Sequence, residues 1–541
     1  MSKSKRAISL ILALILILSV GIFFSACRER IPPEWDVLDD FDMDIRFLVN
    51  MGDRGHFDLD GDMDIHTRSI SISETADPNG IVNTAVEYRN RRIEHELNVR
   101  ILLTNTVGMQ NLVGYLMPQL VSGINNYEVI SGFQQFSLMK ILDGGAEHFV
   151  DFNSLTTGDE SNAENMINMD APWWDSNRFE TLSHDGTAFF VTGHLSQAWI
   201  SSMYVSFVNA RLWEEHSNWI YAAVGTSCIY EVVESGRWHL ELWSELSNRI
   251  ASTGARSNTV GFTTFHPTLG GTNLAGPALA AGSGVRYVTY TEDGRPNMTF
   301  GTLHARDFAE RLYELYFHSN AYLAMWHDGE YRPLNMFADG NALMTVHMLH
   351  VAGTHFADME DDFYILPLPK LDREQEQHFT MLHDNVDQYS IPALAREHVR
   401  AITFTLERMA YLSYTYVFPA YHQELLGGIF TDEADFARVM EMLNYIRTGE
   451  TACLAMLWSG RLSSLSHFFI SNINSNFRET VLVTRVLWER DLNELLRELD
   501  QAAYSVKPPP PPTPEAQLDS DQAADENDYV AETSPTYTET E

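Results

Sequence analysis

Residues 45–49 read Ile-Arg-Phe-Leu-Val, a short apolar run that predicts a β-strand. Residues 82–97 then place apolar side chains at helical spacing, and residues 99–103, Val-Arg-Ile-Leu-Leu, predict a second strand. A further helix is expected at 112–120, before a third strand at 127–130, Tyr-Glu-Val-Ile. Strands and helices that alternate in this order favour a parallel sheet with helices on both faces.

The loop after the third strand, residues 132–136, is a candidate binding loop that contains Gln134. Ligands of such sheets lie outside the carboxyl ends of the strands, and this loop follows one of those ends.

A second α/β block begins near Tyr204. Residues 203–208 predict a strand, and residues 237–250 predict an amphipathic helix with apolar side chains on one face. Residues 362–367 predict another strand, which ends at a proline, and helices follow at 436–446 and 482–499. We therefore expect an α/β protein with two lobes, each a sheet flanked by helices.

Composition limits the possible functions of the chain. It has 541 residues, of which 45% are hydrophobic and 20% are charged, so it is not a wholly disordered protein. It carries 74 acidic residues against 36 Lys and Arg, a formal charge of -38. A nucleic-acid binder with a basic footprint is therefore excluded.

The N-terminus predicts export and a lipid anchor. Lys3, Lys5 and Arg6 precede an apolar run at 8–24. The four residues 24–27, Phe-Ser-Ala-Cys, resemble the lipobox of bacterial lipoproteins, in which the cysteine receives diacylglycerol and becomes the new N-terminus. The resemblance implies lipidation of Cys27 on the extracytoplasmic face of the cell membrane. An uncleaved N-terminal anchor is the alternative.

Two further cysteines, Cys228 and Cys453, exclude a disulfide framework. One disulfide between them is possible, but we expect two buried, unpaired thiols.

Several motifs together resemble, in their order, the extracellular solute-binding proteins of family 1, the carbohydrate-binding lipoproteins of bacterial ABC importers. They are 85–90 with 96–99, the Pro-Trp-Trp-Asp segment at 172–175, the strand and helix at 204–213, Ser-Gly-Arg-Trp at 235–238, 337–344, Asp-Phe-Tyr-Ile-Leu-Pro-Leu-Pro-Lys at 362–370, and 389–392. The resemblance covers residues 44–500. At 239–240, His and Leu replace the family's Thr and Trp.

This resemblance implies a two-lobed periplasmic-binding-protein-like fold of type II, with chain crossings between the lobes. The ligand would lie in the cleft, and the lobes would close over it by a hinge motion. The expected partners are a small-molecule carbohydrate, a membrane permease and its ATPase. A monomer without cofactor, metal or enzymatic activity is expected.

The expected divisions combine these observations. They are a lipoprotein signal peptide at 1–27, a tether at 28–43, the first part of lobe 1 at 44–190, the first part of lobe 2 at 191–383, a return segment of lobe 1 at 384–420, a C-terminal helical part mainly in lobe 2 at 421–506, and a Pro-rich acidic tail at 507–541, whose composition predicts disorder.

A sugar site needs aromatic faces and fixed polar groups that bond to hydroxyls. The candidates, each with core packing or a solvated loop as the alternative, are Trp173, Trp174, Asp175, Trp238, Trp326, Asp384, Asn385, Asp387, Tyr389, Tyr204 and Gln134.

Other features carry less functional information. His347, His350 and His355 suggest a metal site, but their apolar neighbours favour structural histidines. The acidic run 58–64 fails the EF-hand spacing, and no nucleophile elbow, P-loop, zinc helix or dinucleotide fingerprint is present. Three alternatives stay open: an extracellular glycan-active enzyme, a surface sensing or adhesion protein that retains the binding fold, and a binding protein whose ligand is not a sugar, such as a peptide.

Overall fold

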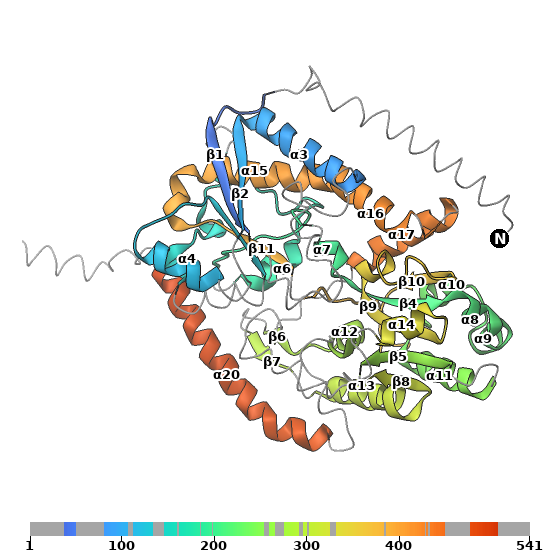
Figure 1. The fold of residues 1–541 in the computed structure, drawn as a ribbon. Helices are drawn as coiled ribbons and strands as arrows, with labels where there is room; N and C mark the ends of the chain where they lie inside the picture. Colours follow the sequence, from blue (N-terminus) through green and yellow to red (C-terminus); the bar gives the residue numbers. More distant parts are fainter. Residues whose placement is uncertain are drawn as a thin grey trace, which may run out of the picture.

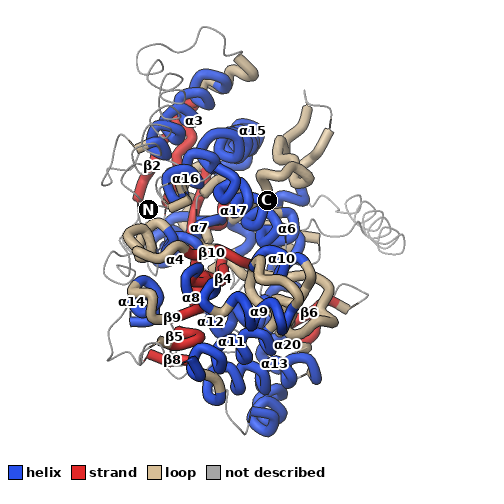
Figure 2. The backbone as a smooth tube through the Cα atoms, turned by 90° about the vertical axis from the view of Figure 1, so that its right-hand side faces the viewer, coloured by secondary structure: helices blue, strands red, loops and turns tan. Residues whose placement is uncertain are grey.

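The computed structural model contains two separate β-sheets, each flanked by helices (Figures 1 and 2). It describes residues 37–49, 80–105, 112–133, 145–158, 162–183, 186–196, 198–253, 259–265, 275–291, 296–299, 302–324, 332–383, 386–427, 429–430, 433–448 and 477–506. The expected signal peptide, its Cys27, most of the tether and the acidic tail lie outside these residues.

The first sheet has the strand order β11-β3-β1-β2. Its strands β1 (Met43–Val49), β2 (Val99–Asn105) and β3 (Val129–Phe133) are parallel, and β11 (Asp387–Ser390) is antiparallel to β3. Helix α3 (Ile81–Leu97) connects β1 to β2, and α4 (Leu112–Val121) connects β2 to β3. The β-α-β-α-β order expected from the sequence is confirmed.

The two faces of the first sheet enter different cores. Successive side chains of a strand point to opposite faces. Phe47 therefore joins a core with α3 and α15 (Val399–Leu412), while Leu48 joins a second core with α4. The apolar run that predicts β1 is therefore buried on both sides, as expected of a parallel strand.

The second sheet has the order β10-β4-β9-β5-β8. Strand β5 (Val260–Phe265) is parallel to both β8 (Ala321–Ala324) and β9 (Ala342–Met348). Strand β4 (Tyr204–Asn209) is antiparallel to β9 and to β10 (Phe363–Leu366). This mixed sheet is the centre of the second lobe.

Helices surround the second sheet and share one large core with it. They are α8 (Ala210–Glu215), α9 (Ser217–Val224), α10 (Ile229–Glu234), α11 (Leu240–Thr253), α12 (Ala275–Gly282), α13 (Leu303–Tyr313) and α14 (Arg332–Ala338). A small hairpin of β6 (Val288–Tyr290) and β7 (Pro296–Met298) lies beside them. Cys228, at the start of α10, is free and exposed, so the expectation that it is buried is wrong.

The chain passes between the lobes three times within the described residues. Residues 191–196 and 198–203, which include the short helix α7 (Ala198–Ser201), lead from the first lobe to the second, and residues 382–383 and 386–389 lead back. The two segments run side by side, joined by bridges between Val191 and Tyr389 and between Met203 and Leu382. The third passage is helical: α15 continues through a π-turn, η11 (Ser413–Val417), into α16 (Phe418–Leu426).

The C-terminal part adds two helices, α17 (Glu433–Thr448) and α20 (Phe477–Val506). Helix α20 contacts the 3-10 turn η4 (Ala146–His148) of the first lobe as well as β7 and α13 of the second, so it lies along both lobes (Figure 1). Among the helices that the structure describes, none is both long and apolar enough to span a membrane. The lobe boundaries expected from the sequence stay predictions.

Candidate functional site

The carboxyl ends of the parallel strands in both lobes face the crossing segments. In the first sheet, Asp387 follows the return crossing and pairs with Phe133 at the carboxyl end of β3. In the second sheet, Tyr204 follows the outward crossing and pairs with Met348 at the carboxyl end of β9. Ligands of α/β sheets bind outside such ends, so the space beside the crossings is the candidate ligand site.

The loops that follow these strand ends contain several expected site residues. Residues 50–79, 106–111, 134–144, 266–274, 325–331 and 384–385 all lie outside the described residues. The expected contributions of Gln134, Trp326, Asp384 and Asn385 therefore stay predictions.

A cluster of aromatic and imidazole rings lies at the end of the second sheet that faces the crossings. We call it the Tyr–His cluster, and its members are Tyr204, His347, His350, His355 and His383. The Tyr204 ring stacks on His383 with centroids 6.3 Å apart and lies 6.4 Å from His347. His350 lies 5.8 Å from His347, and His355 is close enough to affect it electrostatically.

Strand pairing and the crossings bring these rings together. Tyr204 opens β4, His347 pairs across from its neighbour Val205, and His350 lies in the 3-10 turn η9 (Leu349–Ala352). The backbone N–H of His383, in the return crossing, donates to the carbonyl of Ser202 at 3.0 Å. Because η9 packs against both α7 and α16, the cluster lies where the second lobe meets the crossing elements.

Within the Tyr–His cluster, His347 is neutral near neutral pH. Burial lowers the pKa of His347 well below its usual value, and His350, His355 and His383 lower it further. The ring of His347 is partly exposed, but its Nδ1 is enclosed and has no hydrogen-bond partner within the described part of the chain. Neutral imidazoles offer one donor and one acceptor each, which suits hydroxyl groups.

A metal site is not formed by these histidines. Among the described residues, no group of three or more His, Cys, Asp or Glu side chains is arranged to hold a metal ion. The apolar residues on both sides of His347 pack in the core and bury the strand. The imidazoles then contact neighbouring rings.

The adjacent pair Trp173 and Trp174 is held within the first lobe by Glu407 of α15. The indole N–H groups donate to the two carboxylate oxygens at 2.9 and 2.7 Å. The N–H of Asn168 also donates to Glu407, and burial raises the pKa of this carboxyl although these bonds oppose the shift. Trp174 is buried in the core, whereas Trp173 is half-buried beside Tyr411. Only Trp173 is therefore placed to offer part of its ring to a ligand.

Asp175 is a capping residue. It is buried, accepts from the backbone N–H of Arg178 at the start of α6 (Ser176–Leu182), and also pairs with the Arg178 guanidinium. Its other oxygen accepts the indole N–H of Trp199 at 3.0 Å. Asp175 thus links the first lobe to α7 in the outward crossing, and its carboxylate is occupied by protein donors.

Trp238 is fully buried in the core of the second lobe. Its ring packs between Trp213 and Trp243, and its indole N–H donates to the carbonyl of Pro367 at 2.8 Å. Backbone bonds between Trp238, Leu240 and Lys370 join the Ser-Gly-Arg-Trp motif to the Leu-Pro-Lys motif. The structure therefore places Trp238 in the packing of this core, and its contribution to a ligand site stays a prediction.

Asp387 and Tyr389 both lie on β11 and are buried. The backbone of Asp387 accepts a hydrogen bond from Thr192 of the outward crossing, and the ring of Tyr389 joins the core of the first lobe. Both residues shape the crossing, and the structure gives neither an open face toward the candidate site.

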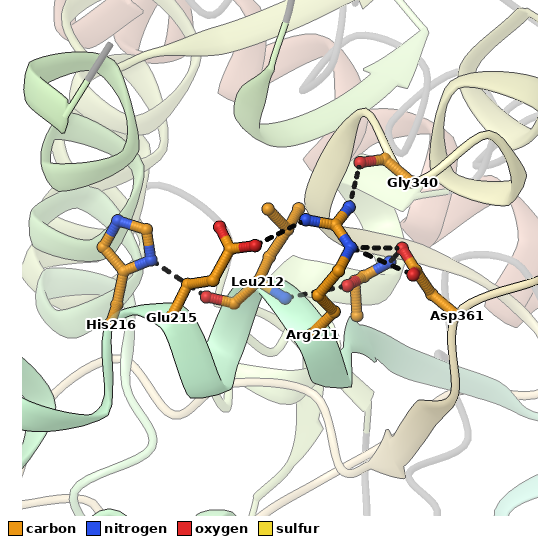
Figure 3. Close-up of polar contacts among 7 residues, drawn as sticks. Arg211, Leu212, Glu215, His216, Gly340 and Asp361 are labelled. Atoms are coloured by element: carbon orange, nitrogen blue, oxygen red, sulfur yellow. Dashed lines mark hydrogen bonds and ion pairs between the residues drawn. The ribbon is translucent and has the colours of Figure 1, made fainter. Parts of the chain in front are cut away.

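Two of the family-like motifs, 204–213 and 337–344, meet in one polar network with Glu215 and Asp361 at the opposite end of the second sheet (Figure 3). Arg211 donates to the carboxylate of Asp361 at 3.0 Å, to Glu215 at 2.9 Å and to the carbonyl of Gly340 at 2.9 Å. Asn209 caps α8 by accepting from Leu212 and donates to the same Asp361. These motif residues fix turns of the second lobe and are remote from the crossing segments.

The sequence did not identify two residues that make important contacts in the structure, His383 and Glu407. His383 lies next to the expected Asp384 but carries no recognisable motif. Glu407 is one acidic residue of a helix, and nothing in its neighbourhood indicates that it accepts from two tryptophans more than 230 residues earlier in the chain.

Comparison with known proteins gives only structural matches. No protein-family model matches the chain, and no curated protein matches it. Solved structures similar to it include the ABC substrate-binding protein Lmo0181 from Listeria monocytogenes in complex with cycloalternan, at 11% identity and a TM-score of 0.44 over 86% of this chain and 98% of that one. RafE from Streptococcus pneumoniae, in its apo-form, is 13% identical with a TM-score of 0.46, over 87% and 100%.

A third similar structure is maltose-bound MalE3 from T. maritima, at 9% identity and a TM-score of 0.45 over 85% of this chain and 99% of that one.

Proposed function

We propose that the chain is a substrate-binding protein of an ABC importer that captures a carbohydrate, most simply an oligosaccharide, between its two lobes. The observation that carries this proposal is the placement of the Tyr–His cluster beside the interlobe crossings, at the carboxyl ends of the strands. The order of the family-like motifs in the sequence supports the same assignment.

The chemistry of the cluster suits a sugar. Aromatic rings bind the C–H faces of a pyranose, while imidazole nitrogens bond to hydroxyls without requiring a charged ligand. The enclosed Nδ1 of His347 has no partner among the described residues, and such an atom costs about 1–3 kcal/mol when it stays unpaired. A ligand hydroxyl that forms a hydrogen bond with this nitrogen would therefore remove most of this free-energy cost.

Attachment to the cell membrane is a separate part of the proposal. The basic start, the apolar run and the Ser-Ala-Cys sequence at 25–27 support lipidation of Cys27 on the extracytoplasmic face. Replacement of this cysteine, Cys27→Ala, should abolish incorporation of labelled fatty acid into the protein. A parent protein that incorporates no labelled fatty acid and keeps residues 1–26 would favour the uncleaved anchor.

Sugar binding can be tested by thermal unfolding and calorimetry against glucose-, galactose-, fructose- and mannose-containing mono- and oligosaccharides. A sugar at 100 times its dissociation constant should stabilise the protein by about 2.7 kcal/mol, which raises the melting temperature measurably. Each mixture is then analysed by chromatography, because recovery of the intact sugar distinguishes a binding protein from an enzyme. Release of shorter products would replace this proposal by a glycan-active enzyme.

Two variants connect the binding to the site. His347→Ala should weaken a sugar that binds at the Tyr–His cluster by about tenfold or more, the loss of one or two hydrogen bonds. The matched control is His398→Ala in the first lobe, a largely exposed histidine beside Glu397. Equal affinity of the two variants would place the sugar elsewhere.

A further inference from the structure

The helix α3 belongs to both lobes. Val82, Ala85 and Val86 in its first half pack in the core of the second lobe, whereas Ile93 and Leu97 in its last turns pack in the core of the first. Buried positions recur at helical spacing along the whole helix, and the one at the boundary between the two cores is Arg89.

The helical passage from α15 to α16 changes lobes in the same way. Residues of α15 such as Leu406 and Met409 pack in the first core, and Phe418 and Tyr421 of α16 pack in the second. The change occurs at the π-turn η11, and α3 packs along α15, η11 and α16. Single π-turns inside α-helices commonly mark functional positions, since the extra residue loosens the regular hydrogen-bond ladder.

Arg89 lies in the middle of α3. At this level both α3 and the passage from α15 to α16 change from the core of one lobe to the core of the other. The side chain of Arg89 is fully buried. Its Nη1 donates to Ser413, the first residue of the π-turn, at 2.9 Å, and its Nε donates to Asn90 at 2.9 Å. Tyr389, on the strand that follows the return crossing, is near enough to interact with the guanidinium electrostatically. One side chain thus connects α3 with the helical passage at η11 and lies near the return crossing.

The guanidinium is not neutralised in this arrangement. Its Nη2 has no hydrogen-bond partner, and no carboxylate of the described residues pairs with it. By contrast, the nearby Arg92 and Arg408 share the buried carboxylate of Glu96. Burial lowers the pKa of Arg89 to about 9, which still leaves it charged at neutral pH. A buried charge without a partner is strongly unfavourable, so this lobe arrangement carries a cost that another arrangement could relieve.

We propose that Arg89 is a positioning residue for the hinge, which keeps the described arrangement of the lobes close in free energy to a second one. In the second arrangement, a shift at the π-turn gives the guanidinium water or another acceptor. This inference deepens the proposed function, since capture between lobes requires two accessible arrangements, but it concerns lobe geometry without any ligand.

The two contacts of Arg89 predict opposite effects of substitution. Arg89→Met removes the charge but keeps much of the side chain's length, so it should favour the described arrangement. Ser413→Ala leaves the charge with one hydrogen bond fewer and should favour the second arrangement. The double variant should behave like Arg89→Met, because Ser413 then has no guanidinium to accept from. Arg91→Met is the control, since Arg91 is exposed and pairs with Glu87 on the surface of α3.

Distances between nitroxide labels measure the populations directly. The labels replace Val121 at the end of α4 and Tyr221 on α9, both exposed and in different lobes, in the whole chain with its native cysteines changed to serine. We expect two distance populations, whose ratio changes about threefold or more in opposite directions in the two single variants. The control should match the parent protein.

Equal shifts in the same direction, or no shift in either single variant, would overturn the proposal and leave Arg89 as ordinary packing. If Arg89→Met does not fold, Ser413→Ala alone decides, because it removes only one oxygen and must still move the populations. Failure of sugar binding would leave these distances unchanged, so the hinge and the ligand are tested separately.

Discussion

The indole N–H of Trp174 donates to the carboxylate of Glu407 at 2.7 Å, across 233 positions of the chain. Trp173 uses the other oxygen of the same carboxylate. The two adjacent rings are therefore fixed on α15 by one acidic residue, which explains how both can pack in the same lobe. The pair is first of all a structural feature of the first lobe.

Removal of this carboxylate should destabilise the protein. Glu407→Ala leaves two indole N–H groups without their acceptor, and we expect a loss of about 2–4 kcal/mol in the free energy of unfolding. Urea unfolding measures this loss, with Glu397→Ala as the control because Glu397 is largely exposed. A loss no greater than that of the control would show that water replaces the carboxylate without cost.

Truncation of Trp238 should destabilise the second lobe without acting on a ligand. Trp238→Ala removes a fully buried ring that contacts two other tryptophans, and we expect a loss of about 3–5 kcal/mol. The half-buried Trp219 is the matched control, and Trp219→Ala should cost clearly less. The milder Trp238→Phe should retain any sugar affinity. If the Trp238→Phe protein folds but does not bind the sugar, Trp238 would instead contribute to the ligand site.

The strands of the first lobe could be predicted because their signal is local. A buried parallel strand needs a short run of apolar residues, and residues 45–49 and 99–103 supply one on each side of a helical pattern. The structure has β1 and β2 in those places, paired from Met43 with Val99 onward. The fold class could therefore be predicted from local patterns in the sequence.

The roles of the aromatic side chains could not be predicted in the same way, because they depend on distant partners. A tryptophan next to an aspartate has the same local pattern in a sugar site and in a capped helix. Asp175 caps α6 and accepts from Trp199, 24 positions later. His347, His350 and His355 lie close together in the sequence and can be grouped from it. The contact of His383 with this group depends on the return crossing, which no local spacing reveals.

Acid should destabilise the protein through buried histidines. Burial lowers the pKa of His239 and His378 to about 4, and it also lowers the pKa of His347 well below its usual value. The unfolded chain binds these protons near pH 6.5, whereas the folded chain resists them, so the free energy of unfolding falls as the pH drops from about 6.5 toward 4. The deeply buried His378 alone should account for about 2 kcal/mol of this fall.

Glu407 acts in the opposite direction. Its folded pKa is raised, so the folded state binds this proton more readily than the unfolded state, and protonation of Glu407 adds stability as the pH falls. Urea midpoints between pH 7 and pH 4.5 should therefore fall less steeply in His378→Gln and more steeply in Glu407→Gln. A parent protein with constant stability across this range would contradict the assignment of neutral, buried imidazoles.

Gly340 links the motif network of Figure 3 to a backbone conformation that favours glycine. It has φ of +69°, and a Cβ at this position would lie 2.5 Å from Oδ2 of Asp361 and 3.0 Å from Nη2 of Arg211. Gly340→Ala should therefore cost about 1–2 kcal/mol from the left-handed backbone, and more because the ion pair must move.

Gly123 provides the matched control for this substitution. Its φ is +73°, but a Cβ there would meet nothing within 4 Å. Gly123→Ala thus has the backbone cost alone, and the difference between the two variants in urea unfolding isolates the contact with Arg211 and Asp361. In an Asp361→Ala background the difference should shrink toward zero, since the oxygen nearest the new methyl group is gone. A difference that persists unchanged would mean that the turn at Gly340, and not its ion pair, sets the requirement for glycine.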